Sequence, residues 1–323
     1  NLYLDSRPSD RVRFFSRARL FHDPTQADPT LEDSVALDQL WVKFDIERSV
    51  FVTIGKQRIK WGTGRFWNPT DYLNIDVLDA LNGVAIFDER LGVPLLKMHY
   101  PVESIGANFY ALMSYDDADT AREIGGALRA EFLVGNHEFS TSVVAQRKAP
   151  LRMGLDYSGA HGPIDLKFEL ALQHGVETPF LRGELDTSPL SIDEFELEGV
   201  DPDDIPSAIE AQLPGVLAAR QPNAVFRDDE LLPQLTVGIE YAQGYGDDDT
   251  IFLGAEYFYN ELGYGDASLY PSLFQQGLFI PFYTGRHYAA AYAAFPSIGS
   301  WNDTSLTVSG LGNLSDESFV ARI

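Results

Sequence analysis

The stretch Asp165-Leu166-Lys167-Phe168-Glu169-Leu170-Ala171-Leu172-Gln173 decides the fold. Its even-numbered residues are Leu166, Phe168, Leu170 and Leu172, whereas its odd-numbered residues include Asp165, Lys167, Glu169 and Gln173. Successive side chains of a β-strand point to opposite sides, so an alternation with period 2 predicts a strand with one apolar face and one polar face.

The same alternation recurs along the chain in segments of about ten residues that are separated by turn residues. This pattern is the signature of strands in a membrane-spanning barrel. Outside such a barrel the hydrocarbon of the membrane takes the place of a protein core. We therefore expect one apolar belt that faces lipid, formed by Val12, Phe14, Leu40, Val42, Phe44, Leu166, Phe168, Leu170, Leu235, Val237 and Ile239.

A soluble β-protein would also alternate, but the lengths of the connections favour the membrane barrel. Short links at 6–9, 47–49, 135–136 and 246–249 alternate with long ones, notably 63–92 and 176–232. Short periplasmic turns and long extracellular loops are typical of outer-membrane barrels. A helical membrane protein is excluded, because the longest apolar run, Tyr288 to Phe295, is far shorter than the ~18 to 20 residues of a spanning helix. The sequence predicts an all-β fold, a transmembrane antiparallel β-barrel.

Fifteen strands are predicted by the same criterion: 1–5, 11–22, 36–46, 51–62, 93–102, 106–115, 125–135, 139–147, 151–159, 165–174, 234–243, 250–260, 283–296, 303–312 and 317–323. If the short links are periplasmic, the first segment descends toward the periplasm. A bacterial barrel normally begins there and has an even number of strands. We therefore expect residues 1–323 to form a single barrel domain that is an internal stretch of a longer barrel, with about 16 or more strands.

The longest connection, 176–232, is predicted to be an acidic extracellular loop. Its dense acidic part runs from Asp193 to Asp204, and the stretch from Pro206 to Arg220 reads as a short helix, although Pro214 interrupts it. The carboxylates at 201–204 and 247–249 are of the type that calcium binds. No EF-hand spacing is present, so solvated acidic turns are the preferred interpretation and no metal site is predicted.

A second long connection, 63–92, is predicted to be an inward-folded loop. From 61 to 71 the chain reads Trp-Gly-Thr-Gly-Arg-Phe-Trp-Asn-Pro-Thr-Asp, which needs tight turns and a place to bury its rings. In a barrel that place is the lumen, so we expect a constriction loop that contains Trp61, Arg65, Trp67, Asn68 and Asp71. An aromatic-clamped hairpin with no role in transport is the alternative.

The run Gly55-Lys56-Gln57-Arg58-Ile59-Lys60-Trp61-Gly62, followed by Asn68-Pro69-Thr70-Asp71, resembles an element of large proteobacterial outer-membrane porin-like proteins. Relatives of the alginate-export barrels are among these proteins. The resemblance is confined to this short part of the chain. It implies a porin-like barrel, but it carries over neither a substrate nor a set of ligand residues.

Charged side chains of the polar parity are unevenly distributed around the predicted barrel. Segments 11–22, 36–46 and 51–62 supply the basic residues Arg11, Arg13, Arg17, Arg19, Lys43, Lys56, Arg58 and Lys60. The remaining segments supply the acidic residues Asp156, Asp165, Glu169, Glu240 and Glu256. A basic wall opposite an acidic wall would set a transverse field across the pore, whereas a mainly basic constriction would select anions or an anionic polymer. Local pairing of charges that fill a narrow lumen is the alternative.

The composition excludes several other classes of function. The chain has 323 residues, no cysteine and a formal net charge of −24, which argues against nucleic-acid binding, thiolate metal sites and covalent haem attachment. Its six histidines are scattered, and it contains no H-E-x-x-H, G-x-S-x-G or P-loop motif. No catalytic residue and no cofactor is therefore predicted.

The predicted function is that of an outer-membrane porin or transport channel for small hydrophilic or anionic solutes, with an anionic polymer as a further candidate. Such a protein would lie in the bacterial outer membrane, surrounded by lipid and lipopolysaccharide. One alternative is a structural sleeve that holds a partner protein, for example an electron-transfer cytochrome. Another is an outer-membrane lipid-modifying enzyme.

Overall fold

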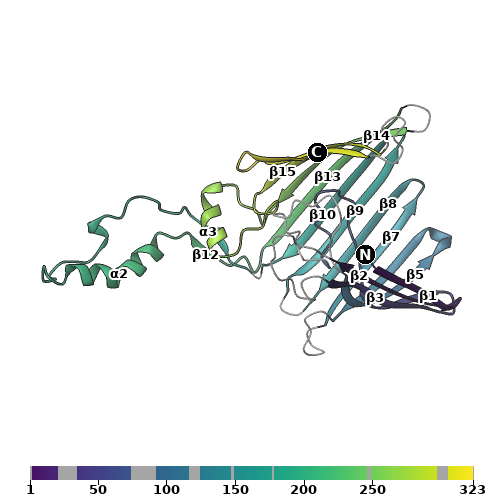
Figure 1. Ribbon diagram of the computed structural model, residues 1–323, viewed down its shortest axis with the longest axis horizontal. Coiled ribbons are helices and arrows are strands. Elements are labelled where there is room, and N and C mark those ends of the chain that lie inside the picture. The colour runs from purple at the N-terminus through teal and green to yellow at the C-terminus, as the bar shows by residue number, and fades with distance from the viewer. Residues whose placement is uncertain are drawn as a thin grey trace.

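A computed structural model of the chain describes residues 2–20, 35–73, 92–115, 124–146, 149–176, 178–245, 249–296 and 305–322. Fifteen of the strands in these ranges form one curved sheet, in which every strand pairs with the next in the sheet (Figure 1). The strands are β1 (Leu2–Ser9), β2 (Val12–Leu20), β3 (Val35–Ile46), β4 (Val50–Gln57), β5 (Val93–Val102), β6 (Ala107–Ser114), β7 (Gly125–Val134), β8 (His137–Ala145), β9 (Leu151–His161), β10 (Ile164–His174), β13 (Leu231–Tyr245), β14 (Asp249–Asn260), β15 (His287–Phe295), β16 (Leu306–Asn313) and β17 (Ser318–Arg322). All of these pairings are antiparallel, as predicted for the barrel.

Each strand of this sheet corresponds to one of the predicted segments, because the alternation of side chains follows directly from the strand geometry. The predicted short links at 47–49 and 135–136 are confirmed as turns between strands. The predicted link at 6–9 is wrong, because these residues belong to β1 and the turn lies at 10–11, and residues 246–248 lie outside the described residues. A further short turn, at 162–163, was not predicted. Gly135 lies between β7 and β8, and Gly162 lies between β9 and β10, with φ angles of 63° and 66°. Glycine adopts such angles at no steric cost, which is why these turns are short.

The prediction for segment 51–62 is wrong at its end, because β4 stops at Gln57. Beyond this point the amide of Gly92 donates directly to the carbonyl oxygen of Asp38 in β3, at 3.0 Å. Past the end of β4, the backbone just before β5 therefore bonds directly to β3. The residues after Gln57 are free to enter a loop, although the sequence continues to alternate.

The register of the strands divides the side chains into two faces. We call the face that carries Asp156, Glu169 and Glu256 the inner face, and the opposite one the outer face. The outer face carries the predicted apolar belt, and none of the eleven belt residues is buried. The most exposed members are Leu40, Leu166, Phe168, Val237 and Ile239. The prediction of an exposed apolar belt is thus confirmed, and it is the surface that a membrane-spanning barrel presents to lipid.

The first and last strands of the sheet lie at its two ends, and the described residues show no pairing between β1 and β17. The expected total of about 16 or more strands, and the expectation of a longer barrel, stay predictions. None of the helices in the described ranges has the length and apolar character that a membrane span requires.

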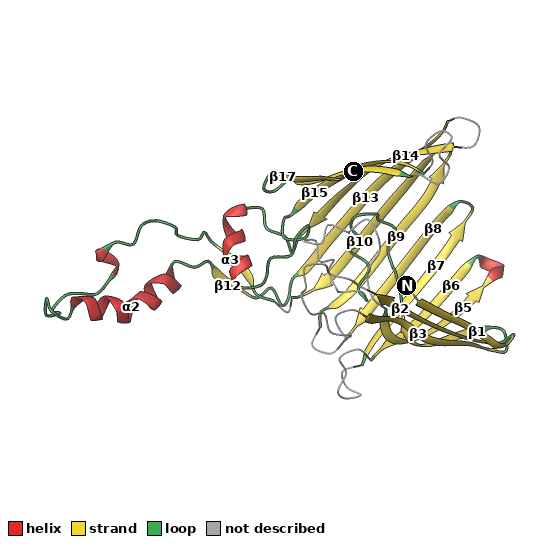
Figure 2. Ribbon diagram, in the orientation of Figure 1, coloured by secondary structure: helices red, strands yellow, loops and turns green. Residues whose placement is uncertain are grey.

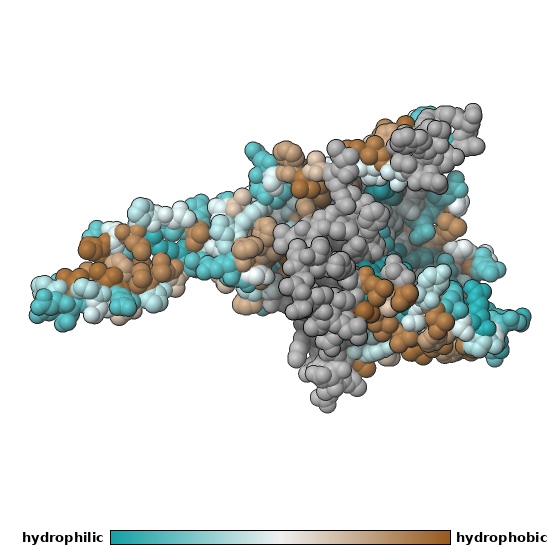
Figure 3. All heavy atoms as spheres, viewed as in Figure 1, coloured by the Kyte–Doolittle hydropathy of each residue, from teal (hydrophilic) through white to brown (hydrophobic). Residues whose placement is uncertain are grey.

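An outer arm, residues 183–222, projects from one end of the barrel (Figure 2). At its base, β11 (Phe180–Arg182) pairs with β12 (Asn223–Val225) in a separate two-stranded sheet that the sequence did not predict. The arm contains the 3₁₀-helix η3 (Ile192–Glu194) and the predicted helix, α2 (Ile205–Ala219). No residue of α2 is buried, and Figure 3 shows apolar side chains at the surface of the arm.

Three further short helices lie in connections between strands. The 3₁₀-helix η2 (Glu103–Ile105) joins β5 to β6, whereas η4 (Ala267–Leu269) and α3 (Tyr270–Gln275) lie between β14 and β15. The last two pack against the base of the arm in a cluster of Leu181, Tyr264, Leu269 and Leu273. This cluster joins two long connections into one apolar unit.

Candidate functional site

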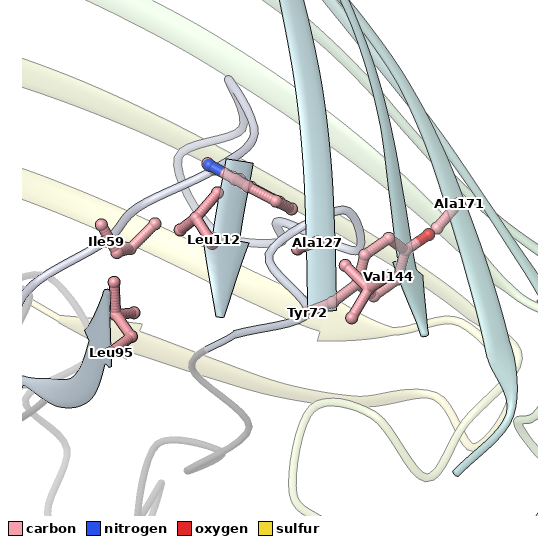
Figure 4. Packing of buried hydrophobic residues seen from close by; sticks show 8 residues of the cluster. Ile59, Tyr72, Leu95, Leu112, Ala127, Val144 and Ala171 are labelled. Carbon is pink, nitrogen blue, oxygen red and sulfur yellow. The ribbon is translucent and has the colours of Figure 1, made fainter. Parts of the chain in front are cut away.

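The segment from Arg58 to Leu73, here called loop 58–73, packs against the inner face of the sheet. Its Ile59, Trp61 and Tyr72 form a cluster with five inner-face side chains, which Figure 4 labels together with Ile59 and Tyr72: Leu95, Leu112, Ala127, Val144 and Ala171. These side chains come from β5, β6, β7, β8 and β10. The otherwise polar inner face is therefore apolar where the rings of the loop are seated.

Glu169 of β10 holds the first turn of the loop. Its carboxylate accepts hydrogen bonds from the amides of Thr63 and Gly64, both at 2.5 Å, and from the hydroxyl of Thr70 at 2.9 Å. The side chain is completely buried. Burying a carboxylate is costly unless hydrogen bonds compensate it, and backbone amides of the loop supply that compensation.

Glu256 of β14 holds the next part of the loop in the same manner. It accepts hydrogen bonds from the amides of Arg65, Phe66 and Trp67, at 2.7, 3.0 and 2.8 Å. The Trp67 ring is 1% exposed and stacks on Phe258, with 5.5 Å between ring centroids. The loop thus reaches from β4 to β14 along the inner face.

Asp156 of β9 links the loop to a third position. Its carboxylate accepts hydrogen bonds from the hydroxyl of Ser140 and from a guanidinium nitrogen of Arg129, each at 2.6 Å. It also lies 2.6 Å from the Thr70 hydroxyl, whose single proton it shares with Glu169. Asp156 lies directly opposite Glu169 in the ladder, so two acidic residues face one another. Arg129 and the donors of the loop offset the repulsion between them.

Two glycines allow the loop to approach these carboxylates. A Cβ atom on Gly62 would lie 2.6 Å from a carboxylate oxygen of Glu169, and the φ angle of Gly62 is +84°. A Cβ atom on Gly64 would lie 2.1 Å from the carbonyl oxygen of Trp67. Gly62 and Gly64 are therefore needed for the close approach of the loop and for its tight turn.

The remaining predicted residues of the loop complete its fold. The amide of Asp71 donates to the carbonyl oxygen of Asn68 at 3.0 Å, which closes a turn around Pro69. Burial raises the pKa of Tyr72 above its ordinary value, so its hydroxyl stays protonated and donates to the carbonyl oxygen of Met153 at 2.6 Å. Residues 74–91 of the predicted loop lie outside the described residues.

Asp38, which the sequence did not single out, organises much of the basic side. The pairing of β2 with β3 shifts by one residue next to Arg17, so Asp38 is the extra residue of a β-bulge. Its carboxylate is completely buried and lies 2.5 Å from a nitrogen of Arg17 and 3.2 Å from nitrogens of Arg19 and Arg58. Three guanidinium groups share this carboxylate, and among the described residues Arg17 and Arg58 form no other ion pair.

Two more basic residues form ion pairs with acidic residues that the sequence analysis had not identified as their partners. Arg13 contacts Asp5 at 2.6 Å, and Arg11, which lies in the turn between β1 and β2, contacts Asp45 at 2.8 Å. Lys43 lies on the inner face, in register with Arg13. Part of the basic charge is thus paired locally.

The register corrects the predicted position of Lys56. It pairs with Leu40 and Pro94, so it has the parity of the outer face. The alternation that continues through Arg58 and Lys60 had suggested that Lys56 faces the lumen as they were expected to do. Arg58 and Lys60, however, both lie beyond the end of β4. The continued alternation of the sequence therefore did not represent a single strand.

The five predicted acidic residues all lie on the inner face. Asp165 of β10 lies opposite Glu240 of β13. The Tyr292 hydroxyl donates a hydrogen bond to Glu240, and the Arg65 guanidinium lies 4.0 Å from the centroid of the Tyr292 ring and 3.8 Å from a Glu240 oxygen. Arg65 thus brings one positive charge from the loop to the acidic wall.

The described residues hold no group of three or more His, Cys, Asp or Glu side chains arranged for a metal ion. The site instead offers fixed charges on an inner face and a loop that is fastened across that face. Such an arrangement can bind and orient charged solutes.

No model of a protein family matches this sequence, and no curated protein matches it. Solved structures are similar to it. An anion-selective porin from Comamonas acidovorans superposes with a TM-score of 0.50 and 9% identity, over 96% of this chain and 76% of the porin. A mutant porin from Rh. blastica gives a TM-score of 0.49 and 9% identity, over 99% and 85% of the two chains. The similarity to the first structure concerns the fold alone, which is like that of a porin β-barrel.

Proposed function

We propose that the chain forms a channel of the bacterial outer membrane for small hydrophilic solutes, that it favours anions, and that loop 58–73 narrows the pore. The observation that carries this proposal is the loop itself, which is fastened by Glu169 and Glu256 across a charged inner face. A structural sleeve needs an inner face that fits a partner protein, whereas here the chain's own loop packs against the inner face of β5 to β8, β10 and β14.

The preference for anions follows from the basic side of the inner face. Among the described residues the carboxylate of Asp38 is the one ion-pair partner of both Arg17 and Arg58, so this pair of arginines exceeds it by one positive charge. Conversely, Glu169, Glu256 and Asp156 already accept hydrogen bonds from loop 58–73 or from Arg129, so most of their acceptor positions are taken. The porin of similar fold is itself named as anion-selective.

The experiment is a reversal-potential measurement on a single channel with Lys43, Lys60 and Lys97 each replaced by Gln. Lys43 and Lys97 lie on the inner face, where both are in register with Thr53 of β4, and Lys60 lies in loop 58–73. These lysines have no carboxylate ion pair among the described residues, so Asp38 keeps its partners. A low-dielectric wall focuses the field, and charges act within a Debye length of ~30 Å at 0.01 M salt and ~8 Å at 0.15 M. The triple variant should shift toward cation preference at low salt, and the shift should shrink as salt rises.

Lys56→Gln is the matched control, because Lys56 has the outer-face parity on a strand that borders the same wall. It should leave the reversal potential unchanged. An unchanged potential in a folded, conducting triple variant would contradict the role of the basic side. A wild-type chain that inserts without conducting would contradict the channel, and lipase and esterase assays would then test for an enzyme.

Single-channel recording also tests how large an anion the channel admits. Small organic anions should carry current through the channel. An anionic polysaccharide, which the sequence resemblance to alginate-export-type barrels suggests as a further substrate, should then block that current or pass with it. We propose that lipid and lipopolysaccharide surround the outer face, since its belt is apolar, and that the acidic chain has no nucleic-acid partner.

A further inference from the structure

We propose that His137, Tyr157 and His161 form a binding site for a divalent transition-metal ion, with copper(II) as the preferred ion. The three side chains lie on the outer face at the end of the barrel where the short turns are. His137 begins β8, and His161 ends β9, so the site lies between the turns at 135–136 and 162–163. The channel function does not use these residues.

The geometry places three donor atoms around one point. Nδ1 of His137 lies 3.0 Å from the Tyr157 hydroxyl oxygen, and Nε2 of His161 lies 3.1 Å from the same oxygen. The two imidazole rings are 4.8 Å apart between centroids. Each ring therefore aims one nitrogen at the phenol from a different strand position.

These separations fit the edges of a coordination polyhedron. Two ligand atoms that lie ~2.0–2.1 Å from a metal ion at right angles are about 2.9 Å apart. The observed distances from oxygen to nitrogen are close to this value. A small shift of the side chains would therefore admit an ion in place of the phenolic proton.

The backbone leaves room for the three groups. A Cβ atom on Gly159, which pairs with His137 across the two strands, would lie 2.4 Å from Nδ1 of His137 and 2.5 Å from the Tyr157 oxygen. A residue with a side chain at 159 would therefore push the donors apart.

The chemistry of the donor set selects the class of ion. Two imidazole nitrogens and one phenol oxygen suit copper(II), which also stands highest among the divalent first-row ions in general affinity. Binding would form one metal–oxygen bond, break the phenolic O–H bond and release that proton to solvent. Water would fill the remaining positions. The chain has no cysteine that would compete for the ion or reduce it.

A second histidine–tyrosine pair provides a matched control. His287 Nδ1 lies 2.7 Å from the hydroxyl oxygen of Tyr257, also on the outer face, but the described contacts give this phenol a single imidazole. If any histidine beside a tyrosine bound copper, copper would bind both at Tyr157 and at Tyr257. A site that needs two imidazoles would load at Tyr157 alone.

The test is a titration of the folded, detergent-solubilised chain with copper(II), followed by visible absorption and by proton release. We expect one equivalent of copper to bind, with a phenolate-to-copper charge-transfer band and one proton released per ion. His137→Ala and His161→Ala should each weaken binding by at least about tenfold, because each removes one of two imidazole ligands. Tyr157→Phe should abolish the band, and His287→Ala should leave both readouts unchanged.

Each variant is shown to be folded if its electrophoretic mobility still changes on heating, as that of a folded barrel does, and if it still conducts. Gly159→Ala offers a test that keeps all three ligands, and it should weaken binding. The proposal is overturned if the wild-type chain shows no charge-transfer band, or if binding is equally strong in the His137→Ala and His161→Ala variants. A loss of the band in His287→Ala would also overturn it, since it would assign the copper to Tyr257.

Discussion

Asp38 is a single residue whose position changes the electrostatics of one wall. By parity it belongs with Leu40 and Val42 on the lipid side, but the bulge next to Arg17 turns it inward. Without it, Arg17, Arg19 and Arg58 would repel one another. Without them, its carboxylate would be buried with no counter-charge.

We predict that Asp38→Asn destabilises the barrel by about 3 kcal/mol, the lower end of the cost of breaking a buried charge pair, because the arginines are partly exposed. Urea unfolding in detergent measures the loss. Asp45→Asn, which breaks the exposed contact with Arg11, is the control and should cost clearly less. Equal costs for the two variants would show that burial of Asp38 contributes nothing.

Gly64 is the residue on which the docking of loop 58–73 depends most closely. We predict that Gly64→Ala displaces the loop, because the new Cβ atom would lie 2.1 Å from the Trp67 carbonyl oxygen. Single-channel conductance should rise, and hydrogen exchange at Thr63 should speed up roughly tenfold or more, as expected for an overpacking cost of about 1–3 kcal/mol. In Gly126→Ala, where nothing lies within 4 Å of the new atom, both readouts should match the wild-type chain.

The outer arm is held in part by ion pairs and hydrogen bonds at the surface. Arg220 donates hydrogen bonds to the carboxylate of Glu194 and to the carbonyl oxygen of Ser188. The hydrogen bond from Arg220 is the main cause that lowers the pKa of Glu194, and the hydrogen bond from the Ser188 side chain is the main cause that lowers the pKa of Asp186. These contacts close the arm near its base.

We predict that the arm keeps its order at neutral pH and loses it in acid. A carboxyl group whose folded pKa is lowered stabilises the folded state above its unfolded value, here near 4.5 for Glu194 and 3.8 for Asp186. That contribution is lost as the pH falls through the lower folded values, so below about pH 4. Hydrogen exchange of residues 186–221 at pH 7 and pH 3 measures the change. In Arg220→Gln, exchange of the arm should already be fast at pH 7. The prediction is contradicted if neither the lower pH nor this substitution speeds up exchange.

The elements of the sheet could be predicted from the sequence because a strand imposes its period on neighbouring side chains. The contacts of the site could not, since they join distant positions: Thr63 and Glu169 are 106 residues apart, and Arg65 and Glu256 are 191 apart. Three features lay beyond a parity rule. They are the bulge at Asp38, the early end of β4 at Gln57, and the pairing of β11 with β12.

At the scale of the whole molecule, the barrel and the arm carry separate parts of the charge. Residues 186–219 contain nine carboxylates and no lysine or arginine. In the part of the chain that the structure describes, the inner face has its basic cluster around Asp38 and its acidic residues on β9, β10, β13 and β14. The arm therefore places a negative field at one end of a channel whose wall is partly basic.

We predict that replacing residues 186–219 by a short Gly-Ser linker leaves the barrel folded and its conductance at 1 M salt unchanged. The hairpin of β11 and β12 remains to close the base. At 0.01 M salt the anion preference should increase, because nine negative charges that repel anions are gone. Parallel reversal potentials at the two salt concentrations test this, and a decrease in anion preference would contradict it.

The span of loop 58–73 across the inner face also sets an order of assembly. The loop leaves β4 early in the chain, but its anchors Glu169 and Glu256 belong to β10 and β14, which follow much later. Contacts of such large sequence separation form slowly, because the intervening chain must first be ordered. We therefore expect loop 58–73 to dock only after β10 and β14 have joined the sheet.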